Sequence, residues 1–474
     1  MKILTIFRSP KAVLSLMAIF LFLTWNITPP AEITLNGWRI TMVFVATIAG
    51  VMSCTMPMGM VVIMTICFSV ITNIIPINKA FSGFASTAVW LIIGAFCIAK
   101  AVIKTGLGER VAYYLISKMG SSLKGIAYSL LFTDFLISPF IPSATARAGG
   151  IFLPIGKALI TEFKSEKQDS AIAKFIMMII FHSNIITNTM FLTAMAGNPI
   201  AVRIASNLGI QITWIDWAIA ALIPGIISII ALPLILGKLC GINDINQSKN
   251  NDTVIAAKNA LQKLGPLTKK EAYLVIIFIG LISMWMLEQV TGINAAIVAL
   301  VGMSALLLTK IIEWQDVIEE KGAWDTMIWY GGLLMLADAI SGAGSIQWLV
   351  NITTEILAEL DKGLILAICG LFFFYIHYFF ASTTAHLTAM LAPFILLLTQ
   401  TLGFPAVPAA LGLTFLSSLS GGLTHYGISP APLLFGVGYV SLKSWWQLSG
   451  ITATWNFALW IFTGFIWWRI LGWI

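Results

Sequence analysis

Two short stretches, Ser143-Ala144-Thr145-Ala146-Arg147 and Ser382-Thr383-Thr384-Ala385-His386, follow one pattern in the middle of strongly apolar sequence. In each, a cationic side chain stands two residues after a threonine, and a proline, Pro154 or Pro393, comes eight residues after the alanine. A polar insert with a cation, at matching places in two apolar halves, is what a membrane carrier of small anions needs. The pattern therefore predicts a duplicated membrane architecture around a buried anion site.

The composition of the 474-residue chain excludes a water-soluble protein. Hydrophobic residues make up 59% of it and charged residues only 10%, against roughly 25% in soluble proteins. The mean hydropathy is +0.94, and the apolar runs are too long and continuous for a barrel of alternating strands. The net charge of +7 is small, and no basic cluster is interleaved with aromatic residues, so nucleic-acid binding is not indicated. The chain is predicted to be an all-α polytopic membrane protein.

About eleven transmembrane helices and two re-entrant hairpins are expected, because about 20 apolar residues cross a bilayer. The expected spans lie near residues 12–28, 39–53, 57–77, 84–114, 168–208, 213–240, 271–290, 293–312, 322–354, 405–440 and 449–474. The hairpins occupy 123–161 and 362–402, where polar sequence interrupts an apolar run. Non-helical backbone at that depth is tolerated only inside protein or beside a wet cavity. The alternative is two ordinary spans in each segment.

Basic residues set the expected orientation, because cytoplasmic loops carry an excess of Lys and Arg. Lys2, Arg8 and Lys11 place the N-terminus in the cytoplasm, and the later lysines fall in alternate loops. An odd number of crossings puts the C-terminus outside. We therefore expect an integral protein of a bacterial plasma membrane.

A polar linker, 241–270, divides the chain into two halves that carry the same landmarks in the same order. Residues 1–240 form the first predicted repeat and 271–474 the second. Gly106 matches Gly344, the two tips match, and an interval from threonine to proline follows each tip. An odd number of crossings separates equivalent elements, so the copies have opposite orientations. Such an inverted repeat lets one site face either side of the membrane.

Two interruptions follow the hairpins: Thr193–Pro199 reads TAMAGNP and Thr424–Pro430 reads THYGISP. Proline removes a backbone donor and glycine admits unusual dihedral angles, so both segments are expected to break a helix. The N–H groups freed at the start of the second half-helix attract anions. A simple proline kink is the alternative for either segment. The expected substrate contacts in these segments are Thr193, Gly197, Asn198, Pro199, Thr424, His425, Gly427, Ser429 and Pro430.

Arg147 and His386 are the cations of the two tips. An arginine at membrane depth costs about 2.5–3.5 kcal/mol, so it normally has a partner. One interpretation pairs Arg147 with a substrate carboxylate in bidentate fashion. The other pairs it with Asp134 across the hairpin, or lets it snorkel. His386 is a second cation or a neutral donor to the substrate, or else a core histidine bonded to a neighbour.

The hydroxyl groups of the two tips offer short donors for carboxylate oxygens, although helix capping explains each of them equally well. The expected contacts are Ser143, Thr145, Ser382, Thr383 and Thr384, and Ala144 of the first tip is expected at the substrate with them. His182, Asn184 and Asn188, on the helix before the first interruption, either line the cavity or join helices. The four histidines lack zinc-type spacing and no Gly-x-Ser-x-Gly element appears. We expect no metal, no cofactor and no enzymatic activity.

The two tips, the two interruptions and the run Gly421-Gly422-Leu423-Thr424-His425-Tyr426-Gly427 resemble the divalent-anion/sodium symporter family over most of the chain. Within it, the chain is similar to the bacterial and plastid exchangers of dicarboxylates and tricarboxylates. The resemblance implies inverted repeats, two re-entrant hairpins, a homodimer in the lipid membrane and an elevator-like movement of the substrate-bearing part.

One departure from the family's pattern bears on mechanism. The usual tip motif is Ser-Asn-Thr, whose asparagine contacts carboxylate and helps to build sodium sites, and both asparagines are missing here. A cation built into the protein would then take the place of sodium ions. An empty site would cross the membrane poorly, whereas a site holding a dicarboxylate would be nearly neutral. We therefore expect obligate, sodium-independent exchange of anions such as succinate, malate, fumarate, 2-oxoglutarate or citrate.

A sodium-coupled symporter and an anion channel are the alternatives to an exchanger. A sodium-coupled dicarboxylate symporter is the nearer one, and the sodium dependence of uptake separates the two. A channel would pass anions without any counter-substrate, and the two apparent gating hairpins argue against it.

Overall fold

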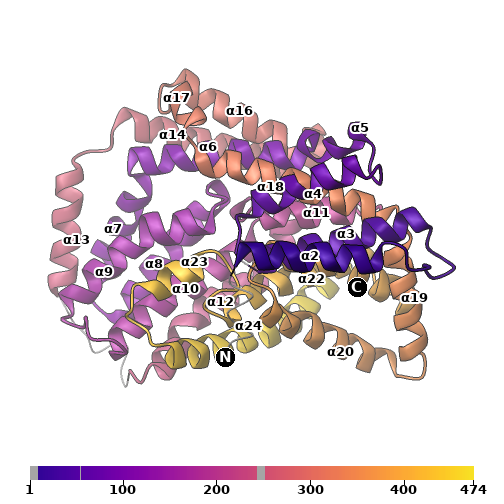
Figure 1. Ribbon diagram of the computed structural model, residues 1–474. Coiled ribbons are helices and arrows are strands. Elements are labelled where there is room, and N and C mark those ends of the chain that lie inside the picture. Colours follow the sequence, from indigo (N-terminus) through magenta and orange to yellow (C-terminus); the bar gives the residue numbers. More distant parts are fainter. Residues whose placement is uncertain (1–8, 54, 243–250) are drawn as a thin grey trace. The chain divides into compact units, whose positions relative to one another are not determined.

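The computed structural model describes residues 9–53, 55–242 and 251–474. Every regular element in these ranges is a helix, mostly α with short 3-10 and π segments (Figure 1). The expected all-α class is therefore confirmed. Lys2 and Arg8, used above for the orientation, and residues 243–250 of the linker lie outside the described residues.

Two compact units divide the chain, and each draws on both sequence halves. The first unit takes described residues from Met1–Ile93, Pro199–Ile212 and Lys321–Thr414. Its elements are α2 (Pro10–Thr24), α3 (Leu35–Met52), α4 (Met58–Ile71), α5 (Ile77–Ala80), η1 (Ser82–Ala85), α18 (Lys321–Ser341), α19 (Ser345–Leu357), α20 (Lys362–Tyr375), η5 (Ile376–Phe379), α21 (Thr383–Leu396) and η6 (Leu397–Thr401). Three helices supply residues to both units: α6 (Thr87–Thr105), α11 (Gly197–Asn207) and α22 (Ala406–Ser420).

The first unit is built around α18, which packs against α3, α4 and η1. Small residues allow a close approach: a Cβ on Gly83 would lie 1.8 Å from the carbonyl oxygen of Gly331. Only glycine fits at position 83 for this reason. Apolar side chains fill the contact, with Val62 and Leu334 fully buried.

The second unit takes described residues from Gly94–Asn198, Thr213–Glu320 and Phe415–Ile474. Its elements are α7 (Leu107–Met119), α8 (Leu123–Ile137), η2 (Ser138–Phe140), η3 (Ala146–Phe152), α9 (Leu153–Glu162), α10 (Ala171–Met190), η4 (Leu192–Ala194), α12 (Trp214–Leu239), α13 (Asn251–Leu264), α14 (Lys269–Met286), α15 (Glu288–Thr291), α16 (Ala295–Leu308), α17 (Trp314–Ile318), η7 (Gly421–Leu423), α23 (Pro430–Gly436) and α24 (Leu442–Ile470).

Helix α10 forms the centre of the second unit and packs against α8, α9, α12 and α24. In its most apolar window 83% of the residues are buried, as expected for a helix surrounded by other helices. Trp217 of α12 is fully buried and donates its indole N–H to the Thr189 carbonyl, 2.9 Å away, which ties α12 to α10. At the edge of the same unit, α13 lies beside α7 (Figure 1).

Local sequence sets where helices begin and bend. Thr213 and Asp216 form a capping box at the start of α12, so the first backbone donors of that helix are satisfied. Gly106 separates α6 from α7, and Gly344 separates α18 from α19. Their φ angles are 73° and 81°, a left-handed conformation that glycine adopts without strain. The two expected spans that contain these glycines are therefore each broken there.

Among the described residues, seven helices are long and apolar enough to cross a membrane, or up to eight if α18 and α19, which meet at 60°, count as one span. The arms of the second hairpin, Lys362–Phe379 and Thr383–Thr401, belong to this set, whereas α8 and α9 of the first hairpin do not. Helices α2, α4 and α16 are apolar but shorter. The number of about eleven crossings stays a prediction.

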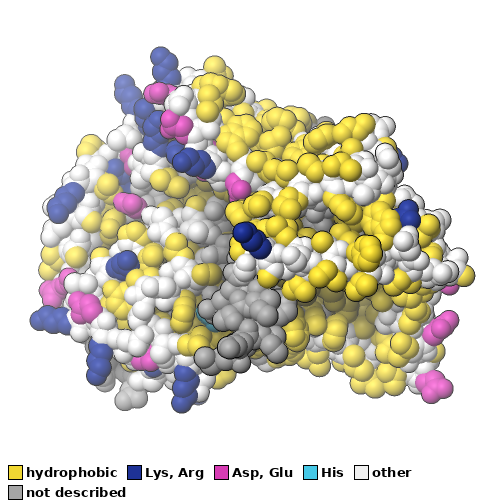
Figure 2. Space-filling view, viewed as in Figure 1, with side chains coloured by type: hydrophobic (Ala, Val, Ile, Leu, Met, Phe, Trp, Pro, Cys, Tyr) yellow, Lys and Arg dark blue, Asp and Glu magenta, His cyan; other side chains and the backbone are white. Residues whose placement is uncertain are grey.

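Helix α2 exposes large apolar side chains on its surface, as a helix in contact with lipid does. Leu16, Ile19, Phe22 and Leu23 are between 43% and 82% exposed. Figure 2 shows apolar side chains over α2 and α3, and a group of Lys and Arg side chains around α17. A soluble protein rarely exposes apolar side chains so continuously, whereas lipid tails accept them.

One succession of elements occurs twice. The bend at Gly106 leads through α7 and α8 to the 3-10 helix η2 and the first tip, and the bend at Gly344 leads through α19 and α20 to η5 and the second tip. Then α10, η4 and α11 are matched by α22, η7 and α23. The order of elements thus agrees with a duplicated chain.

Candidate functional site

The first hairpin turns at residues 141–145. Pro139 and Pro142 lack a backbone N–H, so helix α8 ends in the 3-10 helix η2 and cannot continue through the tip. The Ser143 hydroxyl accepts the Ala146 N–H at 3.1 Å, which is the capping role left open above. The chain then enters the π-helix η3, which contains Arg147. Short π segments are common at functional sites.

Arg147 is fully buried, and all five of its N–H donors have acceptors. Its Nε donates to Asp134 at 2.8 Å. One terminal nitrogen donates to the carbonyls of Ile141 and Ala194. The other donates to the Asn188 amide oxygen at 2.6 Å and, more weakly, to the Thr187 hydroxyl at 3.4 Å. The five acceptors come from α8, the tip, η4 and α10.

Asp134 is equally well satisfied. Its second carboxylate oxygen accepts the Thr187 hydroxyl at 2.8 Å and the Ser183 hydroxyl at 3.3 Å, both from α10. Of the two interpretations given for Arg147, the internal ion pair is therefore the one that the structure contains. The pair is net neutral, and in this arrangement its guanidinium has no donor left for a substrate carboxylate. It holds the first tip against α10.

The first interruption is held by side chains that were expected to contact substrate. The buried Thr193 hydroxyl donates to the Pro139 carbonyl at 2.6 Å and accepts the Trp214 indole N–H at 3.2 Å. The buried Asn198 amide donates to the carbonyls of Asn188 and Phe191, at 2.8 and 2.9 Å. These bonds close the loop between α10 and α11. Gly197 begins α11, and Pro199 falls in the first unit.

The second interruption lies in the second unit, between η7 and α23, and both of these elements contact α10. Thr424, Gly427 and Pro430 are buried, whereas Ser429 is exposed. His425 accepts the Trp446 indole N–H at 3.1 Å, and its ring lies 4.9 Å from that of Phe435. These contacts give His425 a role in packing.

Helix α10 carries more polar side chains than sequence reasoning assigned to the site. His182, Ser183, Asn184, Thr187 and Asn188 are all buried. The Asn188 amide donates to Asn184 at 3.1 Å, which extends the network of Arg147 along the helix. Neither ring nitrogen of His182 has a hydrogen-bond partner among the described residues. The sequence signal for these residues is the polar run HSNIITNT, residues 182–189, of which only His182, Asn184 and Asn188 were considered above.

His182 faces Gly422 in η7, the glycine-rich turn that precedes the second interruption. A Cβ on Gly422 would lie 3.5 Å from Cε1 and 3.6 Å from Nδ1 of His182. A buried polar group without a partner costs about 1–3 kcal/mol, so native proteins usually supply a water or ligand atom. The position is therefore a candidate contact for a bound molecule.

The second tip belongs to the first unit. Ser382 stands at the N-cap of α21, but its side chain makes no capping hydrogen bond there. His386 is fully buried, and its ring lies 4.6 Å from Phe373, 4.9 Å from His377 and 5.1 Å from Phe380. Thr383 is buried and Thr384 is half-buried. His386 is therefore surrounded by rings, in contrast to the carboxylate and carbonyls around Arg147.

The expected contacts thus fall into two groups. Within the second unit, the first tip and the first interruption meet at Arg147 and Thr193, and His182 of α10 faces Gly422 in η7, just before the second interruption. Ala144 is buried in this group, and the Thr145 hydroxyl is half-buried and makes no hydrogen bond within the described residues. Residues Pro199, Ser382, Thr383, Thr384 and His386 form the group of the first unit.

Comparison with known proteins gives one family over nearly the whole chain. The profile of the sodium:sulfate symporter transmembrane region matches residues 9–474. The spinach protein named dicarboxylate transporter 1, chloroplastic, is 38% identical over 454 residues, which are 94% of this chain and 79% of the relative. The putative malate transporter YflS of Bacillus subtilis is 38% identical over 455 residues, 94% of each protein. The inner membrane protein YbhI of Escherichia coli is 34% identical over the same share of each.

A solved structure supports the fold. The crystal structure of the Alcanivorax borkumensis YdaH transporter superposes with a TM-score of 0.51 and covers 87% of this chain and 89% of its own. The sequence identity is 13%, so this likeness concerns the arrangement of helices alone.

Proposed function

Because the chain belongs to the sodium:sulfate symporter family, the divalent-anion/sodium symporters that its tips resemble, we propose that it carries small dicarboxylate anions across a membrane. Its family consists of transporters, so the chain is a membrane transporter and not an enzyme. Relatives that align over 94% of this chain are named as dicarboxylate or malate transporters. That similarity supports a substrate with two carboxylates.

One structural observation carries the proposal. Helix α10, a candidate membrane span, carries a run of buried polar side chains that bonds to the first tip through Asn188 and Thr187 and ends at His182, beside the glycine-rich turn η7. Polar groups at membrane depth are costly, and they mark substrate pathways in transporters. A structural role is enough to explain the Arg147–Asp134 pair. It does not explain why both ring nitrogens of the buried His182 lack a hydrogen-bond partner among the described residues.

Arg147 acts in this proposal as a positioning residue. Direct binding of substrate would require the guanidinium to leave Asp134, and breaking a buried pair costs roughly 3–5 kcal/mol. The substrate carboxylates are better served by groups whose donors are not already used, such as the Thr145 hydroxyl and the tip backbone. His386 is then the remaining candidate for a cation at the substrate.

Exchange of one dicarboxylate for another is the proposed mode of transport. Equal-charge exchange moves no net charge and avoids about 2.3 kcal/mol per charge per 100 mV. Both tips lack the asparagine of the Ser-Asn-Thr motif, to which the family resemblance assigns a part in sodium binding, and this absence supports a sodium-independent cycle. We further propose that the two halves form an inverted repeat, that the substrate-bearing part moves like an elevator, and that the protein is a homodimer.

Sodium-coupled symport is the second candidate, and one observation favours it. Asp134 neutralises Arg147, so the first tip holds no permanent positive charge to balance a bound dianion. Co-transported cations would then supply the missing charge.

Purified protein in sealed lipid vesicles separates the two modes. We expect uptake of labelled malate or succinate only when the vesicles contain an unlabelled dicarboxylate, at a rate that an inward sodium gradient does not change. Vesicles without protein and vesicles loaded with sulfate are the controls. Robust uptake into empty vesicles driven by sodium would replace exchange with symport. No transport of any dicarboxylate under either condition would overturn the substrate class.

A further inference from the structure

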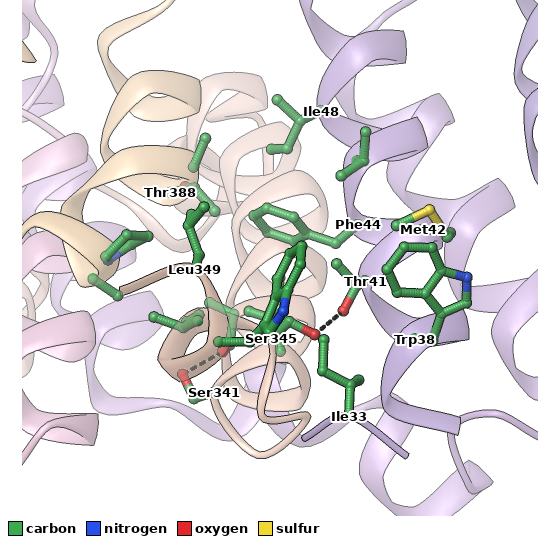
Figure 3. A pocket seen from close by; sticks show the side chains of 18 of the residues that line it. Ile33, Trp38, Thr41, Met42, Phe44, Ile48, Ser341, Ser345, Leu349 and Thr388 are labelled. Carbon is green, nitrogen blue, oxygen red and sulfur yellow. Dashed lines mark hydrogen bonds between the residues drawn. The ribbon is translucent and has the colours of Figure 1, made fainter. Parts of the chain in front are cut away.

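A cavity of about 480 Å³ lies inside the first unit, between α3, α18, α19 and α21 (Figure 3). Its wall is mainly apolar and includes Phe44 and Ile48 of α3, Leu349 of α19, and the ring of Trp38. The volume falls within the roughly 300–1,000 Å³ of sites that hold small organic ligands. None of the expected substrate contacts lines it.

The hydroxyl groups on the wall already have partners. Thr41 and Ser345 are hydrogen-bonded to each other, as a dashed line in Figure 3 shows. Ser341 and Thr388 each donate to the backbone carbonyl one turn earlier, at 2.8 and 2.9 Å. The described residues that line the cavity include no charged side chain. A carboxylate would lose its hydration there without gaining partners, so the chemistry fits a hydrocarbon chain.

The position of the cavity indicates where such a chain comes from. Val45 lies near the middle of the candidate span Leu35–Met52, and Ala389 lies within the candidate span Thr383–Thr401. At the rim, Val45 and Leu349 are 44% and 46% exposed. With α3 crossing the membrane as its length and composition allow, this exposed side of the cavity lies at the level of the hydrocarbon core, where acyl chains take the place of water as solvent. An empty hollow would leave its lining atoms without dispersion contacts.

We propose that one acyl chain of a membrane phospholipid occupies this cavity and braces α21, the helix that follows the second tip. Thr388, Ala389, Ala392 and Pro393 of α21 form one side of the wall. A chain packed between them and α3 holds the helix that carries His386. The site is independent of the transported substrate, because it accepts the apolar part of a lipid and excludes carboxylates.

A photoreactive lipid tests the proposal on the whole protein. Vesicles are prepared with a phospholipid that carries a diazirine near the end of one acyl chain, and the labelled peptides are identified by mass spectrometry after illumination. We expect Val45, Leu349 and Ala389 to carry several-fold more label than Ile19 and Phe22, which are exposed on α2. A diazirine in the headgroup should label none of the three. Equal labelling by a free fatty acid at the same mole fraction would exclude a phospholipid-specific site.

Variants in which a larger side chain fills the cavity show whether the labelling depends on this site. Ala389→Phe places a ring in the cavity and should more than halve the label at Val45 and Leu349. Ala49→Leu fills less space from the α3 side, and it keeps the test decisive if the larger substitution prevents folding. Ala18→Phe, on the exposed face of α2, is the matched control and should leave the label unchanged. Uniform labelling of the whole apolar surface, or undiminished label in both filled variants, would overturn the proposal.

Discussion

The two hairpin tips share a backbone register and differ in chemistry. In each, a 3-10 helix ends at an extended residue, Ile141 or Phe380, and helical structure resumes three residues later. The side chain thirteen positions before the cation reaches the cation in both. For Arg147 it is the Asp134 carboxylate at 2.8 Å, and for His386 it is the Phe373 ring at 4.6 Å.

The repeated hairpin preserves which backbone positions meet, but it does not preserve the chemistry of the side chains there. The backbone decides which positions meet, so equivalent residues contact the cation in both tips. The side chains at those positions decide the electrostatics, so Arg147 is neutralised by a carboxylate and His386 is enclosed by rings. The π segments differ too, since η3 includes Arg147, whereas η6 comes well after His386. The first tip is therefore suited to fixing the hairpin, and the second is the better candidate for binding an anion.

The largest difference in stability between the two tips is expected when leucine replaces Asp134 in one variant and Phe373 in another. Asp134→Leu leaves Arg147 buried without its carboxylate, which should cost roughly 3–5 kcal/mol of unfolding free energy. Phe373→Leu removes part of one buried ring and should cost about 1–2 kcal/mol. Thermal unfolding of the purified protein in detergent measures both. Adding Arg147→Met to Asp134→Leu should restore much of the loss, and equal melting temperatures for the two single variants would contradict the dependence of Arg147 on Asp134.

Replacing His386 should affect transport more than stability. His386→Phe keeps a ring among Phe373, His377 and Phe380, so the unfolding free energy should change by less than about 1.5 kcal/mol. Loss of a hydrogen bond to a charged carboxylate, about 1.5–3 kcal/mol, should slow dicarboxylate exchange about tenfold or more.

The vesicle exchange rate and the melting temperature are measured on the same preparation of this variant. His377→Phe, in the same ring cluster, is the control and should retain exchange. Unchanged exchange by His386→Phe would remove His386 from the substrate site.

The glycine bends before the two hairpins allow a matched test of the duplicated backbone. Gly106→Ala and Gly344→Ala each force alanine into a left-handed conformation, which costs about 1–2 kcal/mol. The cost at Gly344 should be the larger, because a Cβ there lies 3.2 Å from the Glu32 carbonyl oxygen, whereas the space around Gly106 is open. Melting temperatures of the two variants measure the difference. A stability gain in either variant would show that its bend is not required.

The smallest effect is expected from an exposed ion pair in the second unit, which contrasts with the buried one. The Lys104 ammonium donates to Asp316 at 2.6 Å and holds the pKa of that carboxyl below its ordinary value of 3.8. The folded protein therefore binds this proton less tightly than the unfolded chain does. The stabilisation is complete above the ordinary pKa and is lost as the pH falls through the lower folded value.

Asp316→Asn should remove that acid-dependent part of stability. Such a pair contributes less than about 1 kcal/mol, and added salt weakens it. Thermal unfolding measured from about pH 6 to pH 3 compares the variant with the unmodified protein. Identical pH dependence in both would show that Asp316 contributes nothing through its charge.

The candidate site could be predicted in part from the sequence. Asp134 was named as a partner of Arg147 because a hairpin brings its two arms together, and the structure contains that pair. The other acceptors could not be foreseen, because Asn188 and Ala194 lie 41 and 47 residues further along the chain. Thr193 was expected to contact substrate, yet its hydroxyl is used by Pro139 and Trp214. A pattern of residue types does not say which donor meets which acceptor.

The sequence by itself determined that the chain is an all-helical membrane protein and where its helices are interrupted, because apolar runs, prolines and glycines act on the backbone close to where they stand. Only the tertiary structure decided that Arg147 is neutralised, that His386 is enclosed by rings and that an apolar cavity lies beside α21. Each of these depends on side chains brought together from distant segments, and packing in three dimensions chooses those neighbours.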